Sequence, residues 1–219
     1  FKMEFVSGSK CGLPSMAKDL VELVAPTLSM SLKGKNVVMI VANEFEDIEL
    51  LYPLLRLSEE GANVVVVPVK GGLHPRPSAE KPVSGRYGTP VPLEVMTPGR
   101  RYAIKKLEEI AAEDTDCLIF PGGFSPDSLR IDRRIIELVR RTNGLGKVIA
   151  ATCHGPQVLI SAGIVKGRRV TAYEAVKDDL VNAGALYLDL PAVRDGDIVT
   201  GRVPDDLPEF CREIIASLS

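Results

Sequence analysis

A cysteine and a histidine stand side by side in this sequence, as Cys153 and His154, and Gly155 and Pro156 follow them. A thiolate is a strong nucleophile, and an adjacent imidazole can move protons for it. The apolar run at 147–152 predicts a strand before this pair, and proline is typical of the first position of a helix. We therefore expect a sharp strand-to-helix turn with an exposed cysteine, as in a nucleophile elbow, and a lowered pKa for Cys153 at the helix start. A buried structural cysteine is the alternative for such a turn.

A pair of glycines ends another apolar run, where residues 116–120 lead into Pro121, Gly122 and Gly123. Glycine lets the backbone turn so that its N–H groups face a ligand. We expect the backbone N–H groups of Gly123 and His154 to form an oxyanion hole for a carbonyl that the cysteine attacks. An ordinary tight turn is the alternative.

A dense acidic segment at 44–49 follows the first apolar run, at 36–42. Acidic side chains in a first helical turn often only complement the helix dipole. Pro53 cannot donate a hydrogen bond to the carbonyl of Glu49, so it predicts a kink that singles Glu49 out. A carboxylate would repel a thiolate. Glu49 would therefore assist the cysteine as a protonated acid that donates to the sulfur and later moves the proton.

Short apolar runs alternate with helical patterns along most of the chain. We expect strands at 36–42, 63–69, 116–120 and 147–152, and helices at 47–60, 130–141, 156–162, 175–183 and 205–218. Asp195 and Gly196 predict a hairpin near the end. This alternation is typical of an α/β fold with a doubly wound, mostly parallel sheet and helices on both faces. Ligands of such sheets bind at the carboxyl edge, where all three motifs fall.

The composition is that of an ordinary globular chain. The 219 residues are 45% hydrophobic and 26% charged, and 27 basic against 29 acidic residues give a net charge of −2. This balance gives no indication of a nucleic-acid or anionic membrane partner, and no apolar run approaches the roughly 18 residues of a membrane helix. Two histidines and four scattered cysteines make a poor metal or disulfide framework. We expect a cytoplasmic protein that needs no metal and no cofactor.

Two segments depart from the regular pattern. Residues 1–33 show no secretory signal and are expected to be an N-terminal extension of one domain at 34–219. Within that domain, residues 70–101 form a proline- and glycine-rich insertion, because seven of the 16 prolines lie between Pro68 and Pro98. This density excludes helix interiors and central strands. A solvated loop, a hairpin excursion or an interface element is expected there.

Taken together, the motifs resemble the ThiJ/PfpI superfamily, and most closely its PfpI-type branch. The resemblance covers residues 35–218 and rests on segments 42–50, 120–123, 153–163, 173–179 and 202–207. It implies a flavodoxin-like, three-layer sandwich and a reactive cysteine at Cys153. It also implies a homo-oligomer, either a dimer or a larger ring.

The resemblance further implies roles for single residues. Glu49 stands where the family has a buried glutamate that contacts the thiol, Glu46 matches a second pocket carboxylate, and Tyr173 matches a tyrosine that lines the pocket. His154 matches the histidine of the PfpI-type branch. The acidic partner of that histidine comes from a neighbouring subunit, at the position that Asp127 occupies here in place of the glutamate of related members.

The residues and the resemblance favour attack of a thiolate on a carbonyl. The favoured reaction is glutathione-independent conversion of a 2-oxoaldehyde such as methylglyoxal to lactate, through a hemithioacetal on Cys153, with Glu49 and His154 moving protons. Removal of early glyoxal adducts from proteins would use the same groups. An intracellular cysteine peptidase is the alternative, less favoured because a histidine next to the cysteine in sequence is expected to point away from it. A redox-sensing stress protein, in which Cys153 is oxidised, is a further alternative.

Overall fold

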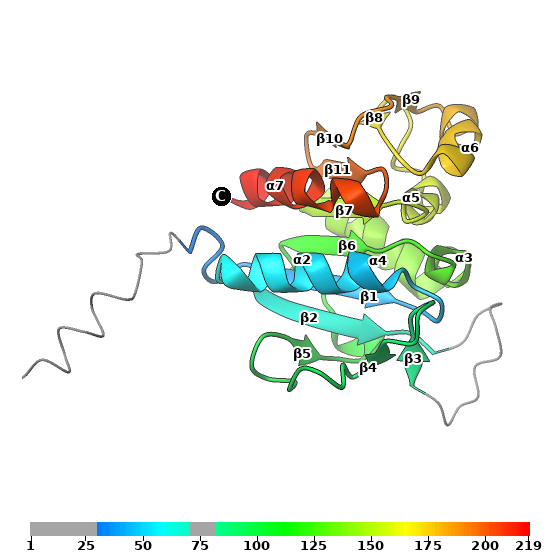
Figure 1. The fold of residues 1–219 in the computed structure, drawn as a ribbon. Helices are drawn as coiled ribbons and strands as arrows, with labels where there is room; N and C mark the ends of the chain where they lie inside the picture. Colours follow the sequence, from blue (N-terminus) through cyan, green and yellow to red (C-terminus); the bar gives the residue numbers. More distant parts are fainter. Residues whose placement is uncertain (1–29, 71–81) are drawn as a thin grey trace, which may run out of the picture.

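The computed structural model describes residues 30–70 and 82–219, and in this part of the chain a seven-stranded sheet forms the centre of the fold (Figure 1). The strand order is β10-β11-β7-β6-β1-β2-β5, and neighbours run parallel except β10 and β11. The strands are β1 (Asn36–Val41), β2 (Asn63–Pro68), β5 (Ala103–Ile104), β6 (Cys117–Phe120), β7 (Val148–Thr152), β10 (Ala192–Asp195) and β11 (Ile198–Gly201).

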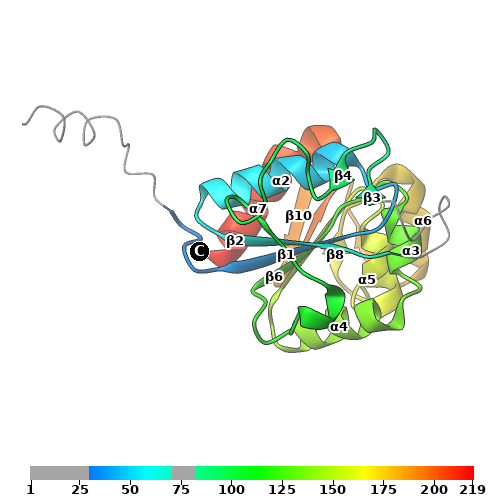
Figure 2. The same ribbon diagram turned by 90° about the horizontal axis from the view of Figure 1, so that it is seen from below.

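Helices cover both faces of this sheet. Figure 2 shows α2 and α7 on one side and α4 and α5 on the other. The helices are α2 (Asp47–Glu59), α3 (Ser125–Leu129), α4 (Arg133–Gly144), α5 (Pro156–Ala162), α6 (Lys177–Asn182) and α7 (Leu207–Leu218), with 3-10 turns η1 (Leu107–Glu109), η2 (Glu174–Val176) and η3 (Pro204–Asp206). The predicted doubly wound, three-layer α/β sandwich is confirmed.

The alternation of side chains along β1 explains how one strand serves two cores. Val37, Met39 and Val41 pack in the cluster that holds the apolar side chains of α2 and α7. Val38 and Ile40 point to the other face and pack in the cluster that holds those of α4 and α5. Because both faces are buried, the strand is apolar at nearly every position, which is the pattern that made it recognisable in the sequence.

The helix predicted at 130–141 is wrong at its start. Residues 125–129 form the separate short helix α3, and α4 begins at Arg133. The reason is a cap that the hydrophobic pattern does not show: the Asp132 carboxylate accepts a hydrogen bond from the backbone N–H of Arg134 at 2.9 Å. The short strand β5 escaped prediction, whereas the predicted hairpin is confirmed, with Asp195 paired to Ile198.

Of the proline-rich insertion, residues 70 and 82–101 are described, and the latter include a hairpin of β3 (Val83–Ser84) and β4 (Pro90–Val91). A second small sheet pairs β8 (Arg169–Val170) with β9 (Leu186–Tyr187). The β3–β4 hairpin is fixed to the start of α2, because the Asp47 carboxylate accepts hydrogen bonds from the backbone N–H groups of Tyr87 and Thr89, both at 2.9 Å. The predicted N-terminal extension lies almost wholly outside the described residues.

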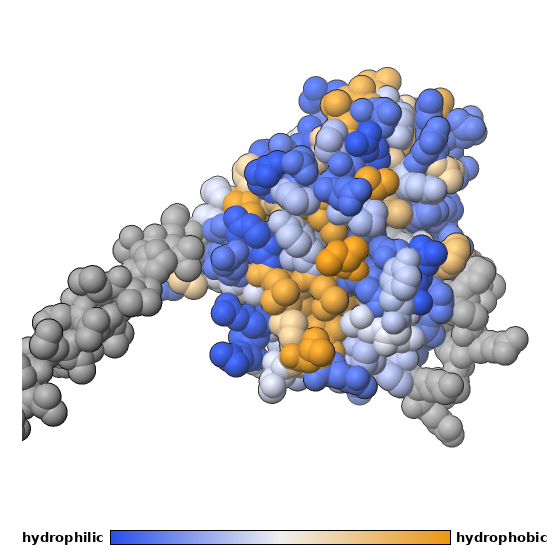
Figure 3. Space-filling view, in the orientation of Figure 1, coloured by the Kyte–Doolittle hydropathy of each residue, from blue (hydrophilic) through white to orange (hydrophobic). Residues whose placement is uncertain are grey.

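On the face shown in Figure 3, polar side chains predominate, but apolar side chains gather over α2 and the surface next to it. The exposed large apolar side chains of α2 are Ile48 and Leu55. Among the residues described, no helix combines the length and the apolar character that crossing a membrane requires.

Candidate active site

Cys153 lies at the end of β7 with a positive φ of 57°, which a residue with a side chain rarely adopts. Pro156 starts α5 three residues later. Gly155 is required between them, because a Cβ there would overlap the carbonyl oxygen of Phe120. The predicted strand-to-helix turn is present, but the prediction that its cysteine is exposed is wrong, because Cys153 is buried with only 9% of its surface exposed.

Glu49 lies in the first turn of α2 and is fully buried. The backbone N–H of Gly122 donates a hydrogen bond to its Oε2 at 2.7 Å, whereas its Oε1 is buried with no hydrogen-bond partner. A Cβ on Gly122 would lie 2.7 Å from the Cβ of Cys153 and 2.8 Å from Oε2 of Glu49. The missing side chain of Gly122 therefore leaves room for the acid beside the thiol. The sequence predicted that Glu49 lies near Cys153 but did not reveal this role of Gly122.

Burial dominates the ionisation of this pair. It raises the pKa of Glu49 to about 7, against the hydrogen bond from Gly122. It also raises the pKa of Cys153 to about 12, and the charge of Glu49 adds to the effect. The prediction that the helix start lowers the pKa of Cys153 is thus wrong, because burial and the Glu49 charge outweigh the N–H groups. The two groups cannot both be ionised at neutral pH, and a proton on Glu49 removes the repulsion.

Two backbone N–H groups face the sulfur. Those of Gly123 and His154 both interact with Cys153, where they favour its charged form and oppose the effect of burial. Gly123 has a φ of 69°, and a Cβ on it would overlap the carbonyl oxygen of Glu44. These are the two donors that the sequence predicted for an oxyanion hole. The structure places both beside the sulfur, and their action on a carbonyl oxygen stays a prediction.

His154 turns toward the thiol, so the prediction that it points away is wrong. Its Nδ1 lies 3.3 Å from Sγ of Cys153. The reason is packing from the next loop, because Tyr173 stacks on the imidazole with ring centroids 5.1 Å apart and an interplanar angle of 30°. Burial lowers the pKa of His154, so the ring is neutral at neutral pH and able to accept a proton.

Asp127 is one of the charged residues that affect the pKa of His154. It lies in α3 of the same chain, and its charge raises the pKa of His154 in opposition to burial. The predicted contribution of Asp127 from a neighbouring subunit stays a prediction. The remaining described cysteines, Cys117 and Cys211, are buried in the core, and burial raises the pKa of both. Both lie within the apolar cluster between the sheet and helices α2 and α7.

Arg86 is a site residue that the sequence did not reveal. Its Nη1 lies 3.1 Å from Oε2 of Glu46, the predicted second pocket carboxylate, and its guanidinium lies 5.2 Å from the ring centroid of Phe124. Its charge lowers the pKa of both Glu49 and His154. In the sequence, Gly85 and Gly88 indicate only that a turn surrounds Arg86. They do not indicate that this turn folds back onto the acidic segment at 44–49.

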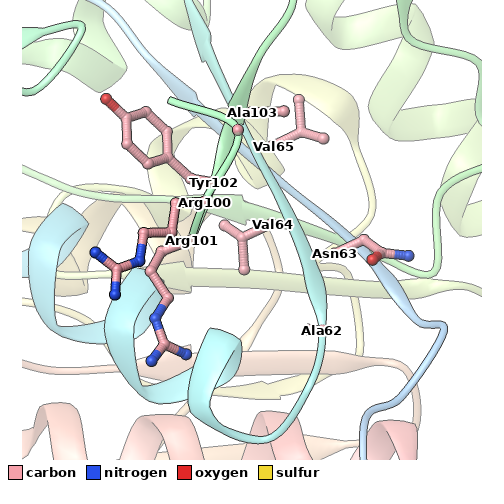
Figure 4. Close-up of a pocket in the computed structure, with 9 residues that line it drawn as sticks. Ala62, Asn63, Val64, Val65, Arg100, Arg101, Tyr102 and Ala103 are labelled. Carbon is pink, nitrogen blue, oxygen red and sulfur yellow. The ribbon is translucent and has the colours of Figure 1, made fainter. Parts of the chain in front are cut away.

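The site lies at the carboxyl edge of the sheet, beside a cavity of about 290 Å³ that shares Tyr173 and extends to Lys177, Tyr187 and Arg202. A different cavity of about 200 Å³ lies between the start of β2 and residues 99–103, where Arg100 and Arg101 extend toward α2 (Figure 4). It holds none of the predicted site residues. Residues 30–70 and 82–219 contain no group of three or more His, Cys, Asp or Glu side chains placed to bind a metal.

Comparison with known proteins assigns this chain to a family. Residues 35–217 match the sequence model of the DJ-1/PfpI family. Deglycase PfpI of Pyrococcus furiosus is 36% identical over 83% of this chain and 98% of its own, and the putative cysteine protease YraA of Bacillus subtilis is 38% identical over 82% and 95%. The crystal structure of Drosophila melanogaster DJ-1beta superposes with a TM-score of 0.68 at 26% identity, over 84% of this chain and 90% of that one.

Proposed function

The chain belongs to the DJ-1/PfpI family, and we propose that it is a cysteine-dependent enzyme that converts 2-oxoaldehydes, free or as early adducts on proteins, to 2-hydroxy acids without glutathione. The observation that carries this proposal is the buried acid Glu49 beside the thiol of Cys153. An acid that keeps its proton up to about pH 7 suits addition to an aldehyde, where a proton must be available as the oxygen becomes negative.

The proposed reaction uses the groups around Cys153. His154 takes the proton of the Cys153 thiol, and the sulfur adds to the aldehyde carbon while the N–H groups of Gly123 and His154 hold the oxyanion. Glu49 and His154 then move a proton from the first carbon to the second, which leaves a thioester on the sulfur. Water hydrolyses the thioester to the 2-hydroxy acid and restores the thiol, so that atoms and electrons balance without an oxidant.

Early glyoxal adducts enter the same sequence. Such an adduct forms reversibly when a lysine or cysteine side chain adds to the aldehyde carbon, which then carries a hydroxyl group. Transfer of that carbon to the Cys153 sulfur releases the free side chain and gives the same hemithioacetal. This route agrees with the names of relatives such as protein/nucleic acid deglycase 2 of Escherichia coli, which is 45% identical over 52% of this chain.

A cysteine peptidase is the second candidate, and one contact favours it. The Nδ1 of His154 lies 3.3 Å from Sγ of Cys153, which is the relation of base to nucleophile that peptidases require. The buried acid has no part in that mechanism, so the peptidase explains less of the site. A redox sensor explains still less, because the raised pKa and the 9% exposure of Cys153 both slow its oxidation.

The test measures lactate formed from methylglyoxal without glutathione, with casein and a fluorogenic peptide assayed alongside. We expect lactate from the wild type, none from Cys153→Ala, and a loss of at least a hundredfold in Glu49→Gln. Glu137→Gln, on the exposed side of α4, is the matched control and should keep full activity. Peptide cleavage that survives Glu49→Gln, with no lactate from the wild type, would establish the peptidase instead.

The cytoplasmic location and the homo-oligomer, a dimer or a larger ring, stay predictions. The exposed apolar side chains of α2, Ile48 and Leu55, are the candidates for a subunit contact. Light scattering of the wild type and of a variant with Ile48→Ser and Leu55→Ser tests the assembly, and a monomeric wild type would contradict it.

A further inference from the structure

A 2-oxoaldehyde carries two oxygens, and both must be stabilised during turnover. The N–H groups of Gly123 and His154 serve the oxygen on the carbon that the sulfur attacks. When the proton leaves that carbon, the electron pair moves toward the neighbouring carbon and negative charge develops on the second oxygen, as in an enediolate. This second oxygen needs a cation or a strong donor of its own.

Arg86 is placed to be that donor. It stands on the turn of the β3–β4 hairpin, and its Nη1 contacts Glu46, the residue before α2. Its guanidinium lies 5.2 Å from the ring centroid of Phe124, the residue that follows Gly123, and its charge acts on Glu49 and on His154. The guanidinium therefore lies on the rim of the same site, on the side of the acidic segment.

The guanidinium is not needed to hold the hairpin in place. The backbone N–H of Arg86 donates to the carbonyl of Phe45 at 2.9 Å, and the Asp47 carboxylate accepts from Tyr87 and Thr89. The guanidinium has five N–H donors, and its hydrogen bond to Glu46 occupies one side of it. Because 41% of its side chain is exposed, Arg86 is accessible to a ligand while its Nη1 contacts Glu46.

We propose that Arg86 is a further catalytic residue, which binds the oxygen on the carbon next to the aldehyde and stabilises the enediolate through its planar fork. The inference rests on the proposed function. Arg86 makes no covalent bond and releases no proton, so the balance of the reaction is unchanged. It also gives a specificity, because aldehydes with an oxygen or a carboxylate on the neighbouring carbon bind better than simple aldehydes.

The experiment compares the wild type with Arg86→Met and Arg86→Lys. Arg194→Met, an exposed arginine on the edge strand β10, is the matched control. Two small aldehydes serve as probes: glyoxylate, which has a carboxylate next to the aldehyde, and acetaldehyde, which does not. Each is tested for protection of Cys153 against alkylation by iodoacetamide, measured by intact mass, and lactate formation from methylglyoxal is followed in parallel.

We expect Arg86→Met to lower kcat about a hundredfold and to weaken protection by glyoxylate at least tenfold, with protection by acetaldehyde unchanged. Arg86→Lys should retain part of both effects, and Arg194→Met should retain all of them. Equal changes for the two aldehydes, or a loss of kcat without a loss of glyoxylate protection, would overturn the proposal. The protection measurement needs no turnover. A wild type that forms no lactate would therefore refute the proposed function, whereas the change in glyoxylate protection would still decide whether Arg86 binds the second oxygen.

Discussion

Replacing Glu49 by glutamine should make the protein more stable at alkaline pH while it removes activity. Burial raises the pKa of Glu49 from 4.5 to about 7, a shift that corresponds to about 3 kcal/mol. Below pH 4.5 the folded and unfolded states both hold the proton on Glu49, so the free energy of unfolding does not change with pH through this group. Between pH 4.5 and 7 only the folded state keeps it, so the free energy of unfolding of the wild type falls as the pH rises. Above pH 7 the free energy of unfolding of the wild type is lower by the full amount of about 3 kcal/mol.

Glutamine cannot ionise, and its side-chain oxygen still accepts the hydrogen bond from Gly122, so Glu49→Gln avoids this loss. We expect equal unfolding free energies near pH 4.5 and a gain of up to about 3 kcal/mol for the variant at pH 8. In a chain of this length the gain corresponds to a Tm higher by roughly 6–12 °C. Urea unfolding and calorimetry at both pH values measure it, with Glu137→Gln as control. A variant whose stability follows the wild type at every pH would refute the reasoning.

Three further outcomes test other parts of the site. Activity should fall on both sides of a narrow pH range: protonation of His154, whose pKa burial lowers from 6.5, removes the base on the acid side, and ionisation of Glu49 near pH 7 removes the acid on the alkaline side. A pH profile of kcat/KM checks this, and a flat profile would contradict it. Tyr173→Leu should lower kcat about tenfold through loss of the stacking on His154, with little change in Tm because Tyr173 is 42% exposed. Gly155→Ala should destabilise the fold by more than about 3 kcal/mol because its Cβ meets the Phe120 carbonyl, whereas Gly163→Ala, with nothing within 4 Å, should lose only about 1 kcal/mol in thermal unfolding.

The parts of the fold that could be predicted are those whose physics is local or periodic. The central strands β1, β2, β6 and β7 are apolar because both faces are buried, and this leaves a continuous pattern in the sequence. The two-residue strand β5 has no such pattern, since two residues cannot show a period. The start of α4 depends on one capping carboxylate, that of Asp132, which the hydrophobic pattern does not weigh.

The same distinction applies to the site. The turn at Cys153 and the tight backbone at Gly123 follow from glycine and proline chemistry at short range, and the sequence predicted both. The direction of the His154 ring depends on Tyr173, and the charge of Arg86 reaches Glu46 only because a hairpin folds back across the sheet edge. The pKa of Cys153 depends on burial, which is a property of the whole fold. Contacts between distant segments leave no spacing rule in the sequence.

Main-chain hydrogen bonds hold the loops that carry the acid, the N–H donors and the nucleophile in position. Cys153 and Glu44 both have positive φ angles, 57° and 63°, and such strain persists only where the surroundings enforce it. Two main-chain hydrogen bonds fix these residues: the N–H of Phe124 donates to the carbonyl of Glu44 at 2.8 Å, and the N–H of Cys153 donates to the carbonyl of Gly201 at 3.1 Å. The loops that carry the acid, the N–H donors and the nucleophile are thus tied to the fold by main-chain hydrogen bonds. Removing one reactive side chain should therefore leave the other parts in place, which is why Cys153→Ala and Glu49→Gln report on chemistry rather than on collapse of the site.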